Sequence, residues 1–355
     1  MELPVITALS QELRRHVGLS KSRLETLALL TVGMISARTV NLVHVADERG
    51  SRTVDPASTY RRLQRFFQHV RLPEDWAAPM IAGLAGGAAC RTLVMDRTNW
   101  KIGETEVNLL VLAVKTRHSQ VPLIWRVLDK RGNSGAPERI DLVERYLSIF
   151  GRDSIAMLLA DREFNGEDWL NYLVENDIPF TIRMKEGCYI KTPQAKRWRL
   201  STLLTGQAQG RKATGTLKGM ATSLHFAAKV PKSGEPVIIA TNRTGHDALL
   251  TYRKRWAIES LFGNAKTRGL NLEDTRMTCP AKLHLMTAVL GLAIAWAVRA
   301  AKTRLGHKAP PRKAHGYLAA SYFRIGFTFI RSRLRANPLK AIPEWIKLNP
   351  KYRVV

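Results

Sequence analysis

Three apolar runs, RTLVMD (residues 91–96), NLLVLAVKT (108–116) and PLIWRVLD (122–129), decide the fold of this chain. Each run is short, rich in branched side chains and bounded by polar residues, which is typical of β-strands. The segments between them are short, so we expect the three strands to follow one another in a meander. A sheet therefore begins near residue 91.

Helices and strands alternate after this meander. The stretch ERIDLVERYLSIFG (138–151) predicts an amphipathic helix, and SIAMLLAD (154–161) predicts a buried strand. A second helix at GEDWLNYLVEND (166–177) and a further strand at IPFTIRMK (178–185) come next. This order of elements predicts an α/β domain.

Residues 1–88, before a Gly/Ala-rich stretch, predict a helical N-terminal module. Asp55 followed by Pro56 is a typical helix start, and apolar residues recur after it at helical spacing. Three arginines fall elsewhere on this helix: Arg61, Arg62 and Arg65. DNA contact and an ordinary solvated face explain them equally well.

Two further regions carry a strong positive charge. Residues 183–245 predict a small antiparallel β subdomain inserted into the α/β core, and residues 178–235 hold eleven Lys and Arg against two Glu. Residues 301–355 predict a basic C-terminal region, because residues 299–355 hold fourteen Lys and Arg and only one Glu. Two separate cationic regions indicate a long DNA footprint.

The whole composition indicates an acidic polymer as the partner. The 355 residues include 56 Lys and Arg against 29 Asp and Glu, a formal charge of +27. Such an excess repels itself unless a polyanion offsets it. Nucleic acid is the expected partner. An anionic membrane surface is the alternative, but proteins that bind such a surface usually concentrate their positive charge on one helix or tail.

The sequence predicts a cytoplasmic, nucleoid-associated protein without a membrane segment. Its first residues contain no basic segment leading into an apolar run. The longest apolar stretch, 283–298, is short for a membrane span and includes His284, so we expect a buried core helix. The three cysteines lack metal-site spacing, and we expect free thiols in a reducing compartment.

The segment TYRKRWAIESLFGNAKTRG (251–269) carries the clearest functional pattern. On one helix, Tyr252, Arg255, Glu259 and Lys266 would fall within an arc of roughly 60°. A carboxylate among cations and a phenol suits a metal ion held against phosphates. The simpler alternative is an ordinary ion pair between Arg255 and Glu259, which are four residues apart.

Two aspartates stand at the ends of predicted strands. Asp96 ends LVMD and Asp161 ends MLLAD. A strand end is a rigid support for a catalytic ligand, although an Asp there can equally cap the next turn. With Glu259, they would supply oxygen ligands for two divalent ions, which favours Mg²⁺, with Mn²⁺ as a substitute.

Over residues 20–300 the chain resembles the prokaryotic DDE transposases of the insertion-sequence IS-four family. The resemblance lies in LVMDRTNW, LLADREF and the Tyr-Arg-Glu-Lys signature. It implies a ribonuclease H-like core, split here into residues 89–182 and 246–300, with Asp96, Asp161 and Glu259 as catalytic metal ligands. It also implies that Tyr252, Arg255 and Lys266 hold phosphates.

The resemblance further implies cut-and-paste DNA transposition. A metal-dependent cleavage at the terminal inverted repeats would precede strand transfer into target DNA, within a homodimer that pairs two ends. Trp198 is the candidate for stacking on a flipped base, and we expect Trp256 to pack against the sheet. A metal-dependent nuclease on the same fold, or a catalytically silent DNA-binding regulator, would use the same features differently.

Overall fold

The architecture is that of a computed structural model describing residues 4–49, 54–205, 212–232, 234–346 and 348. Its centre is a mixed sheet in the order β3-β2-β1-β4-β5-β10-β9-β8-β6-β7. The predicted meander is confirmed: β1 (Arg91–Ile102), β2 (Thr105–Lys115) and β3 (Gln120–Leu128) pair antiparallel. Strands β4 (Ile155–Ala160) and β5 (Phe180–Arg183) then extend the sheet in parallel with β1.

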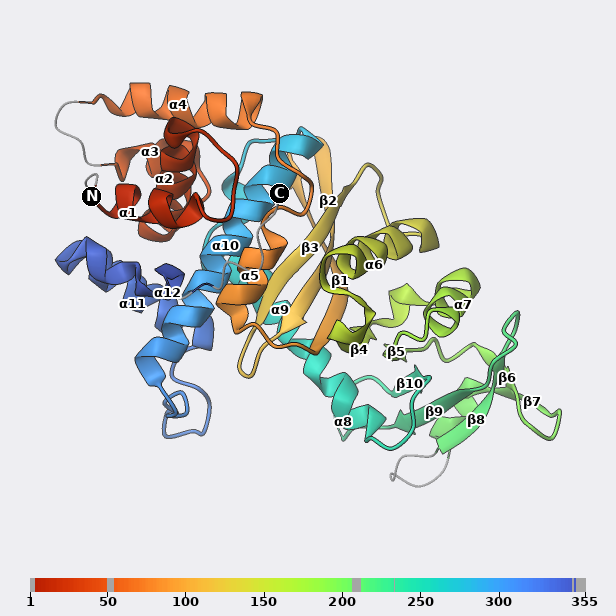
Figure 1. Cartoon of the computed structure of the whole chain (residues 1–355). Helices are drawn as coiled ribbons and strands as arrows, with labels where there is room; N and C mark the ends of the chain where they lie inside the picture. The colour runs from red at the N-terminus through yellow and green to blue at the C-terminus, as the bar shows by residue number, and fades with distance from the viewer. Residues whose placement is uncertain (1–3, 50–53, 206–211, 233, 347, 349–355) are drawn as a thin grey trace.

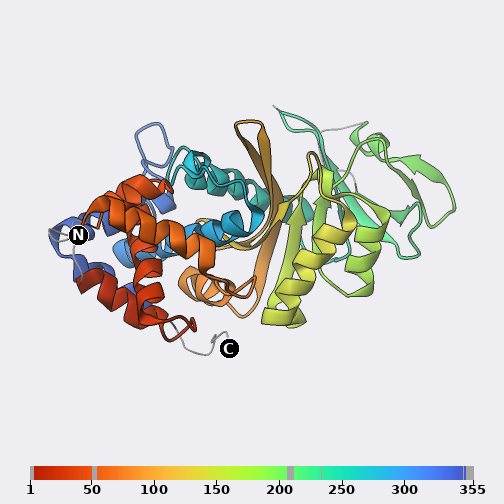
Figure 2. The same cartoon turned by 90° about the horizontal axis from the view of Figure 1, so that it is seen from above.

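Helices cover both faces of this part of the sheet (Figures 1 and 2). Neighbouring residues of β3 show the two sides: the Trp125 indole donates to the carbonyl of His284 in α10 (Pro280–Leu305), whereas Arg126 pairs with Asp141 of α6 (Ala136–Phe150). Helix α7 (Glu167–Glu175) contacts α6. The α/β alternation predicted between residues 138 and 185 is therefore observed, and the architecture is compatible with a ribonuclease H-like core.

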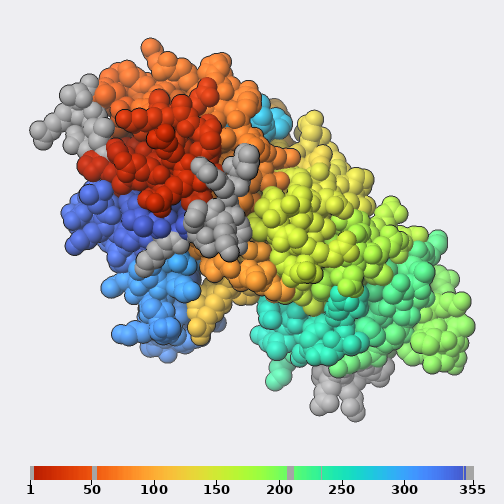
Figure 3. Space-filling view, in the orientation of Figure 1, coloured from red at the N-terminus to blue at the C-terminus, as the bar shows by residue number. Residues whose placement is uncertain are grey.

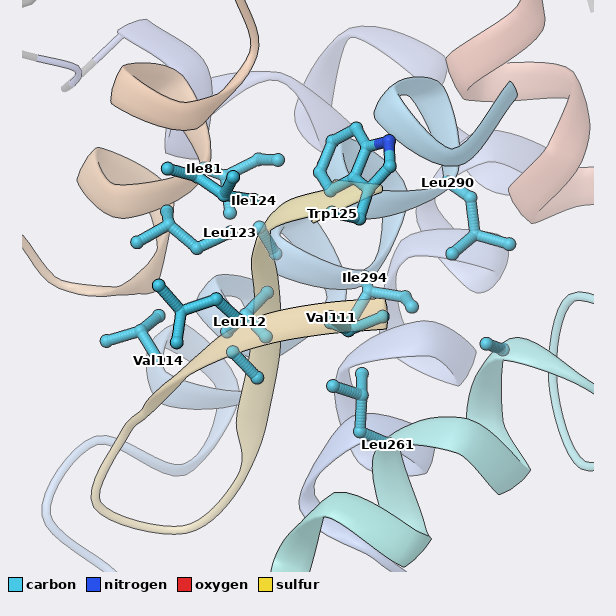
Figure 4. Close-up of a cluster of buried hydrophobic side chains, with 14 of the residues drawn as sticks. Ile81, Val111, Leu112, Val114, Leu123, Ile124, Trp125, Leu261, Leu290 and Ile294 are labelled. Atoms are coloured by element: carbon cyan, nitrogen blue, oxygen red, sulfur yellow. The ribbon is translucent and has the colours of Figure 1, made fainter. Parts of the chain in front are cut away.

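The face opposite α6 is a continuous apolar layer (Figure 4). Val111 and Trp125 from the sheet meet Leu261 of α9 (Ala257–Ala265) and Leu290 of α10 there. Helix α5 (Ala78–Ala85) adds Ile81 to the same layer. These side chains are almost completely buried, so the sheet that carries the predicted aspartates is held rigidly from behind.

The predicted insertion forms antiparallel strands that continue the central sheet. Strand β10 (Val237–Thr241) pairs with β5 through Ile239 and Arg183, and β9 (Leu224–Lys229) pairs with β10. Beyond them the sheet continues with β8 (Lys212–Leu217), β6 (Tyr189–Lys191) and β7 (Arg197–Arg199). The β5 edge is thereby paired instead of exposed. Arg211, one of the eleven predicted cations, lies outside the described residues.

The N-terminal residues are helical as predicted. Besides α5, they form α1 (Pro4–Leu13), α2 (Lys21–Ala37), α3 (Leu42–Asp47) and α4 (Pro56–His69). The Asp55 carboxylate accepts the Ala57 N–H at 3.2 Å, which confirms the predicted start of α4. The apolar side of α4 is buried through Leu63, Phe66 and Phe67.

Helix α10 joins the N-terminal helices, the sheet and the C-terminal helices. It is the one described helix long and apolar enough to cross a membrane, yet 83% of its most apolar window is buried inside the protein. A buried core helix was predicted here. Helix α11 (Tyr322–Ala336) approaches it so closely that a Cβ on Gly326 would lie 1.7 Å from the carbonyl oxygen of Ala297.

The described part of the C-terminal region packs beside the N-terminal helices (Figures 1 and 3). Helix α11 contacts α2, and the short helix α12 (Pro343–Ile346) contacts α1. Lys347 and residues 349–355, which contribute to the predicted basic tail, lie outside the described residues. The three cysteines are free thiols, as expected.

Candidate active site

Asp96 and Asp161 lie side by side because of the register of two parallel strands. Met95 of β1 pairs with Ala160 of β4, so Asp96 and Asp161 follow this last pair at the same level of the sheet. Asp161 follows the end of β4 as predicted, but the prediction that Asp96 ends a strand is wrong, because β1 continues to Ile102 in a hairpin with β2 and Asp96 pairs there with Val111. Each carboxylate also accepts the next backbone N–H, from Arg97 at 2.8 Å and from Arg162 at 2.7 Å. Asp161 thus caps the turn that follows β4 and still converges with Asp96 on Arg255.

The signature segment is interrupted near its centre. Helix α8 (Ala248–Arg253) ends in a 3₁₀ turn over Lys254–Trp256, and α9 follows. Gln120 contacts this turn: its side-chain amide donates to the main-chain carbonyls of Lys254 and Arg255. The tighter turn changes the helical phase, so the four signature residues do not share one face as the ideal helix predicted.

Arg255 connects the two aspartates. Its Nη1 lies 3.0 Å from Oδ2 of Asp96, and its Nη2 lies 3.6 Å from Oδ2 of Asp161. The Tyr252 hydroxyl donates to Oδ1 of Asp161 at 3.0 Å and accepts from Nε of Arg255 at 3.1 Å. Among the ion pairs of the described residues, Arg255 has these two acidic partners and does not pair with Glu259, so the simple i,i+4 pair is not formed.

Burial controls the electrostatics of this cluster. It raises the pKa of Asp96 to about 6, although Arg255 and the Arg97 N–H act in the opposite direction. Burial also raises the pKa of Tyr252, so this phenol stays protonated as a hydrogen-bond donor. A carboxyl whose pKa is raised towards neutrality beside specific charged partners is typical of functional sites.

Glu259 lies apart from the two aspartates. Its side chain is exposed on α9, and its Oε2 accepts the indole N–H of Trp256 at 2.8 Å. Over the described ranges, no three His, Cys, Asp or Glu side chains are grouped closely enough to hold a metal ion. The structure therefore brings Asp96, Asp161, Tyr252 and Arg255 together and leaves Glu259 one turn away.

Residues 90–296 match the family model of the transposase DDE domain. The chain belongs to this family. Family membership indicates a transposase, an enzyme whose partner is DNA, and members of the family generally use divalent metal ions. No curated protein matches the chain.

Trp256 has a different place in the DDE domain from the one predicted. Its side chain is 67% exposed, so the expectation that it packs against the sheet is wrong. The 3₁₀ turn is the physical reason: Tyr252 and Arg255 are buried on the sheet side, which leaves Trp256 facing outward beside Glu259.

Lys266 ends α9 and contacts β1 farther along the strand. Its Nζ donates to the carbonyl of Asn99 at 2.9 Å and pairs with Glu273 at 3.0 Å. It also lies 5.6 Å from the centre of the Trp100 ring. We call the cluster of Asp96, Asp161, Tyr252 and Arg255 the DDE centre. Lys266 lies beside β1 and does not contact the aspartates of this centre.

The other predicted DNA-binding residues lie away from the DDE centre. Arg61 and Arg65 are exposed on α4, whereas Arg62 pairs with Glu25 and donates to the Ser22 carbonyl, which ties α4 to α2. Trp198 is exposed on β7, seven strand positions from β1. At about 4.8 Å per strand this is roughly 30 Å along the sheet.

Three charged neighbours of the aspartates were not predicted to be site residues. Arg183 places Nη1 3.9 Å from Oδ1 of Asp161. Arg97 pairs with Glu163 at 3.3 Å, and that pair stands beside Asp96. The sequence held a signal, because each aspartate is followed directly by an arginine, in MDRTN and ADREF.

Proposed function

We propose that this protein is a cut-and-paste DNA transposase of the IS-four type, which binds terminal inverted repeats, cleaves the element's ends and joins them to target DNA. One observation carries the proposal: two aspartates from adjacent parallel strands converge on an arginine and a tyrosine of the signature segment. Membership of the transposase DDE family supports it.

The residues present suit a hard divalent cation such as Mg²⁺, with Mn²⁺ as a substitute. Asp96 and Asp161 offer converging carboxylate oxygens, and the guanidinium of Arg255 already compensates their charge there, as a cation would. Asp96, Asp161 and Glu259 would hold the metal. For this, the Glu259 side chain would give up the hydrogen bond that it accepts from the Trp256 indole. The bound ion would activate the attacking oxygen and stabilise the leaving one.

The side chains of the signature segment would position DNA. Arg255 carries a planar set of donors suited to phosphate oxygens, and Tyr252 orients it through a hydrogen bond to Nε. Lys266, beside Asn99, would hold a phosphate farther along the strand. Each role is electrostatic positioning, the main contribution that a protein makes to phosphoryl transfer.

The remaining surface would carry the rest of the DNA. We propose that the N-terminal module of residues 1–88 binds transposon ends through Arg61 and Arg65, with Arg62 supporting α4. Trp198 would contact DNA at the far end of the sheet rather than at the Asp96 centre of the same protomer. The protein would act in the cytoplasm at the nucleoid, as a homodimer that pairs two transposon ends. Its core would consist of residues 89–182 and 246–300, with 183–245 as the β insertion and 301–355 as the basic C-terminal region.

The test uses duplexes made from the DNA that borders the gene on each side. Purified protein with Mg²⁺ should cut these duplexes at the element's end and then join the 3′ ends to a plasmid, whereas a chelator should prevent both steps. Cleavage without joining would identify the nuclease alternative. Specific binding without cleavage in either Mg²⁺ or Mn²⁺ would identify the silent regulator.

A further inference from the structure

A second basic site lies at a different place from the DDE centre. A hollow of about 510 Å³ is lined by the end of α5 with Gly86 and Gly87, the β2–β3 turn, the end of α10 and Tyr322. We call it the cationic hollow, and the basic residues that line it are Lys115, Arg117, His118, Arg299, Lys302 and His307. The Nζ of Lys115 also donates to the carbonyl of Thr116 at 2.8 Å. Arg91 also lines it, but its guanidinium is engaged by Tyr146 and Phe150.

None of the described residues that line the cationic hollow is acidic, so none of them balances this charge. In the part of the chain that the structure describes, Lys115, Arg117, Arg299 and Lys302 take part in none of the ion pairs, whereas Arg97, Arg145 and Arg183 all have acidic partners. Four unpaired cations around one depression repel one another, and an anionic ligand would remove that cost.

Burial and like charge act together at the β2–β3 turn. Burial lowers the pKa of Lys115, and the charge of Lys254 lowers it further. The pKa of His118 is lowered by burial and then by Arg117 and Lys115. His118 is held in place by its ring contact with Tyr322, with centroids 5.0 Å apart. The lowered pKa values mean that positive charge is costly at this turn, so a bound anion would stabilise the charged forms of these groups.

The cationic hollow adjoins the signature segment. Lys254, which acts on Lys115, immediately precedes Arg255, and Gln120 at the end of the turn donates to the carbonyls of both residues. Basic groups thus continue from the hollow towards the residue that bridges Asp96 and Asp161. A chain of regularly spaced negative charges fits this arrangement better than a single small anion.

We propose that the cationic hollow binds backbone phosphates of a DNA segment next to the one being cleaved. The inference rests on the proposed function, since it takes DNA as the substrate. Arg117 and Lys302 are exposed at the rim and would meet the phosphates first. Gly86 and Gly87 leave the α5 side open, because a Cβ at either position would meet nothing within 4 Å, so the backbone of DNA can approach closely.

The main test compares two variants with the same loss of charge. Arg117→Gln/Lys302→Gln removes two cations from the hollow, and Arg126→Gln/Arg152→Gln removes two cations from the α6 side of the sheet, where no DNA contact is proposed. Binding of a 40-bp duplex of random sequence is measured against salt concentration. We expect the slope of log K against log salt to become shallower by about 1 to 2 in the hollow variant, since each phosphate contact contributes roughly 0.9, and to change little in the control.

Lysine acetylation with mass spectrometry localises the contact in the wild-type protein. We expect the duplex to protect Lys115 and Lys302, while inorganic phosphate at the same phosphate concentration protects neither. Equal protection by inorganic phosphate would make the hollow a small-anion site and overturn the inference. Protection that rises with protein concentration in the absence of DNA would instead make it an interface between copies, which also overturns it.

The outcome separates this inference from the proposed function. If the wild-type protein binds the duplex, but the hollow variant keeps the full salt slope and both lysines stay reactive, the hollow is not a DNA site and the transposase proposal stands. If the wild-type protein binds no duplex at all, the proposed function itself fails. Matching thermal unfolding of the two variants and the wild type excludes a folding defect as the cause of weaker binding.

Discussion

The two ends of the ten-stranded sheet are built for different purposes. Strand β2 is almost wholly buried between helices, and the neighbouring strands β1 and β4 carry the two aspartates. At the other end, all three residues of β7 are exposed and two of them are arginines. One sheet therefore supplies a rigid support for chemistry and, through the same hydrogen-bonded ladder, an open basic extension.

The largest expected effect is the loss of DNA cleavage when one of the three acids is removed from the buried end of the sheet. Asp96→Ala, Asp161→Ala and Glu259→Ala should each lower end cleavage by at least about 10³-fold, since each removes a proposed metal ligand. Asp153→Ala, at an exposed aspartate of the same domain, should cleave normally. The measurements are cleavage rate and duplex affinity, and normal strand transfer by any one of the three variants would remove that residue from the active site.

Substitution of one tryptophan at each end of the sheet compares how much the two ends contribute to stability. Trp125→Ala should lower the free energy of unfolding by about 3 to 5 kcal/mol, because the indole is buried against α10 and would leave a cavity. Trp198→Ala on β7 should change it by less than about 0.5 kcal/mol.

Urea unfolding of both variants measures this difference. Trp198→Ala should also weaken binding of single-stranded DNA if its ring stacks on a base. A large loss of stability from Trp198→Ala would show that the extension is a packed element rather than an open surface.

Arg255→Ala should destabilise the metal-free protein by about 1 to 3 kcal/mol. The substitution leaves two carboxylates close together with no cation between them, and the pair is partly screened by solvent. Mg²⁺ should restore more thermal stability to this variant than to the wild type, because it replaces the missing charge.

Thermal unfolding with and without Mg²⁺ checks the effect of Arg255. Arg183→Ala is the matched control, since Arg183 also faces Asp161 but at 3.9 Å and with Glu235 as a second partner. An equal response of both variants would mean that Arg255 has no special role between the aspartates.

The smallest expected effect concerns pH. Burial raises the pKa of Asp96 to about 6, so protons compete with Mg²⁺ for this carboxylate below that pH. Cleavage at limiting Mg²⁺ should fall up to tenfold per pH unit below about 6, and higher Mg²⁺ should recover part of it. Because the pKa of Asp96 is higher in the folded protein than its ordinary value of 3.8, this group stabilises the fold fully at a pH below 3.8. That contribution to the free energy of unfolding is lost as the pH rises through about 6.

Measurement of Mg²⁺ affinity by thermal shift at pH 5.5 and 7.5 tests the titration directly. We expect weaker affinity at pH 5.5. Equal affinity at both values would show that Asp96 does not titrate in this range.

The sequence predicted the strands of the α/β core well because their apolar runs are continuous and the segments that connect them are short. It also predicted that Asp96 and Asp161 converge, although only Asp161 follows a strand end, because β1 continues past Asp96 to Ile102 in its pairing with β2. It did not predict that β10 pairs with β5, because the pairing of distant strands leaves no local pattern. The exposed Trp256 depends on a single 3₁₀ turn, which helical periodicity does not reveal.

The position of α10 has a consequence for how the protein is made on the ribosome. Residues 280–305 form a long apolar helix, and α11, which packs tightly on it through Gly326, is translated afterwards. Until residues 322–336 have left the exit tunnel, one side of α10 has no partner and is exposed to chaperones and to other nascent chains. A product that stops before α11 would therefore aggregate or be degraded, so a shortened chain is poorly suited to accumulate beside the full-length enzyme.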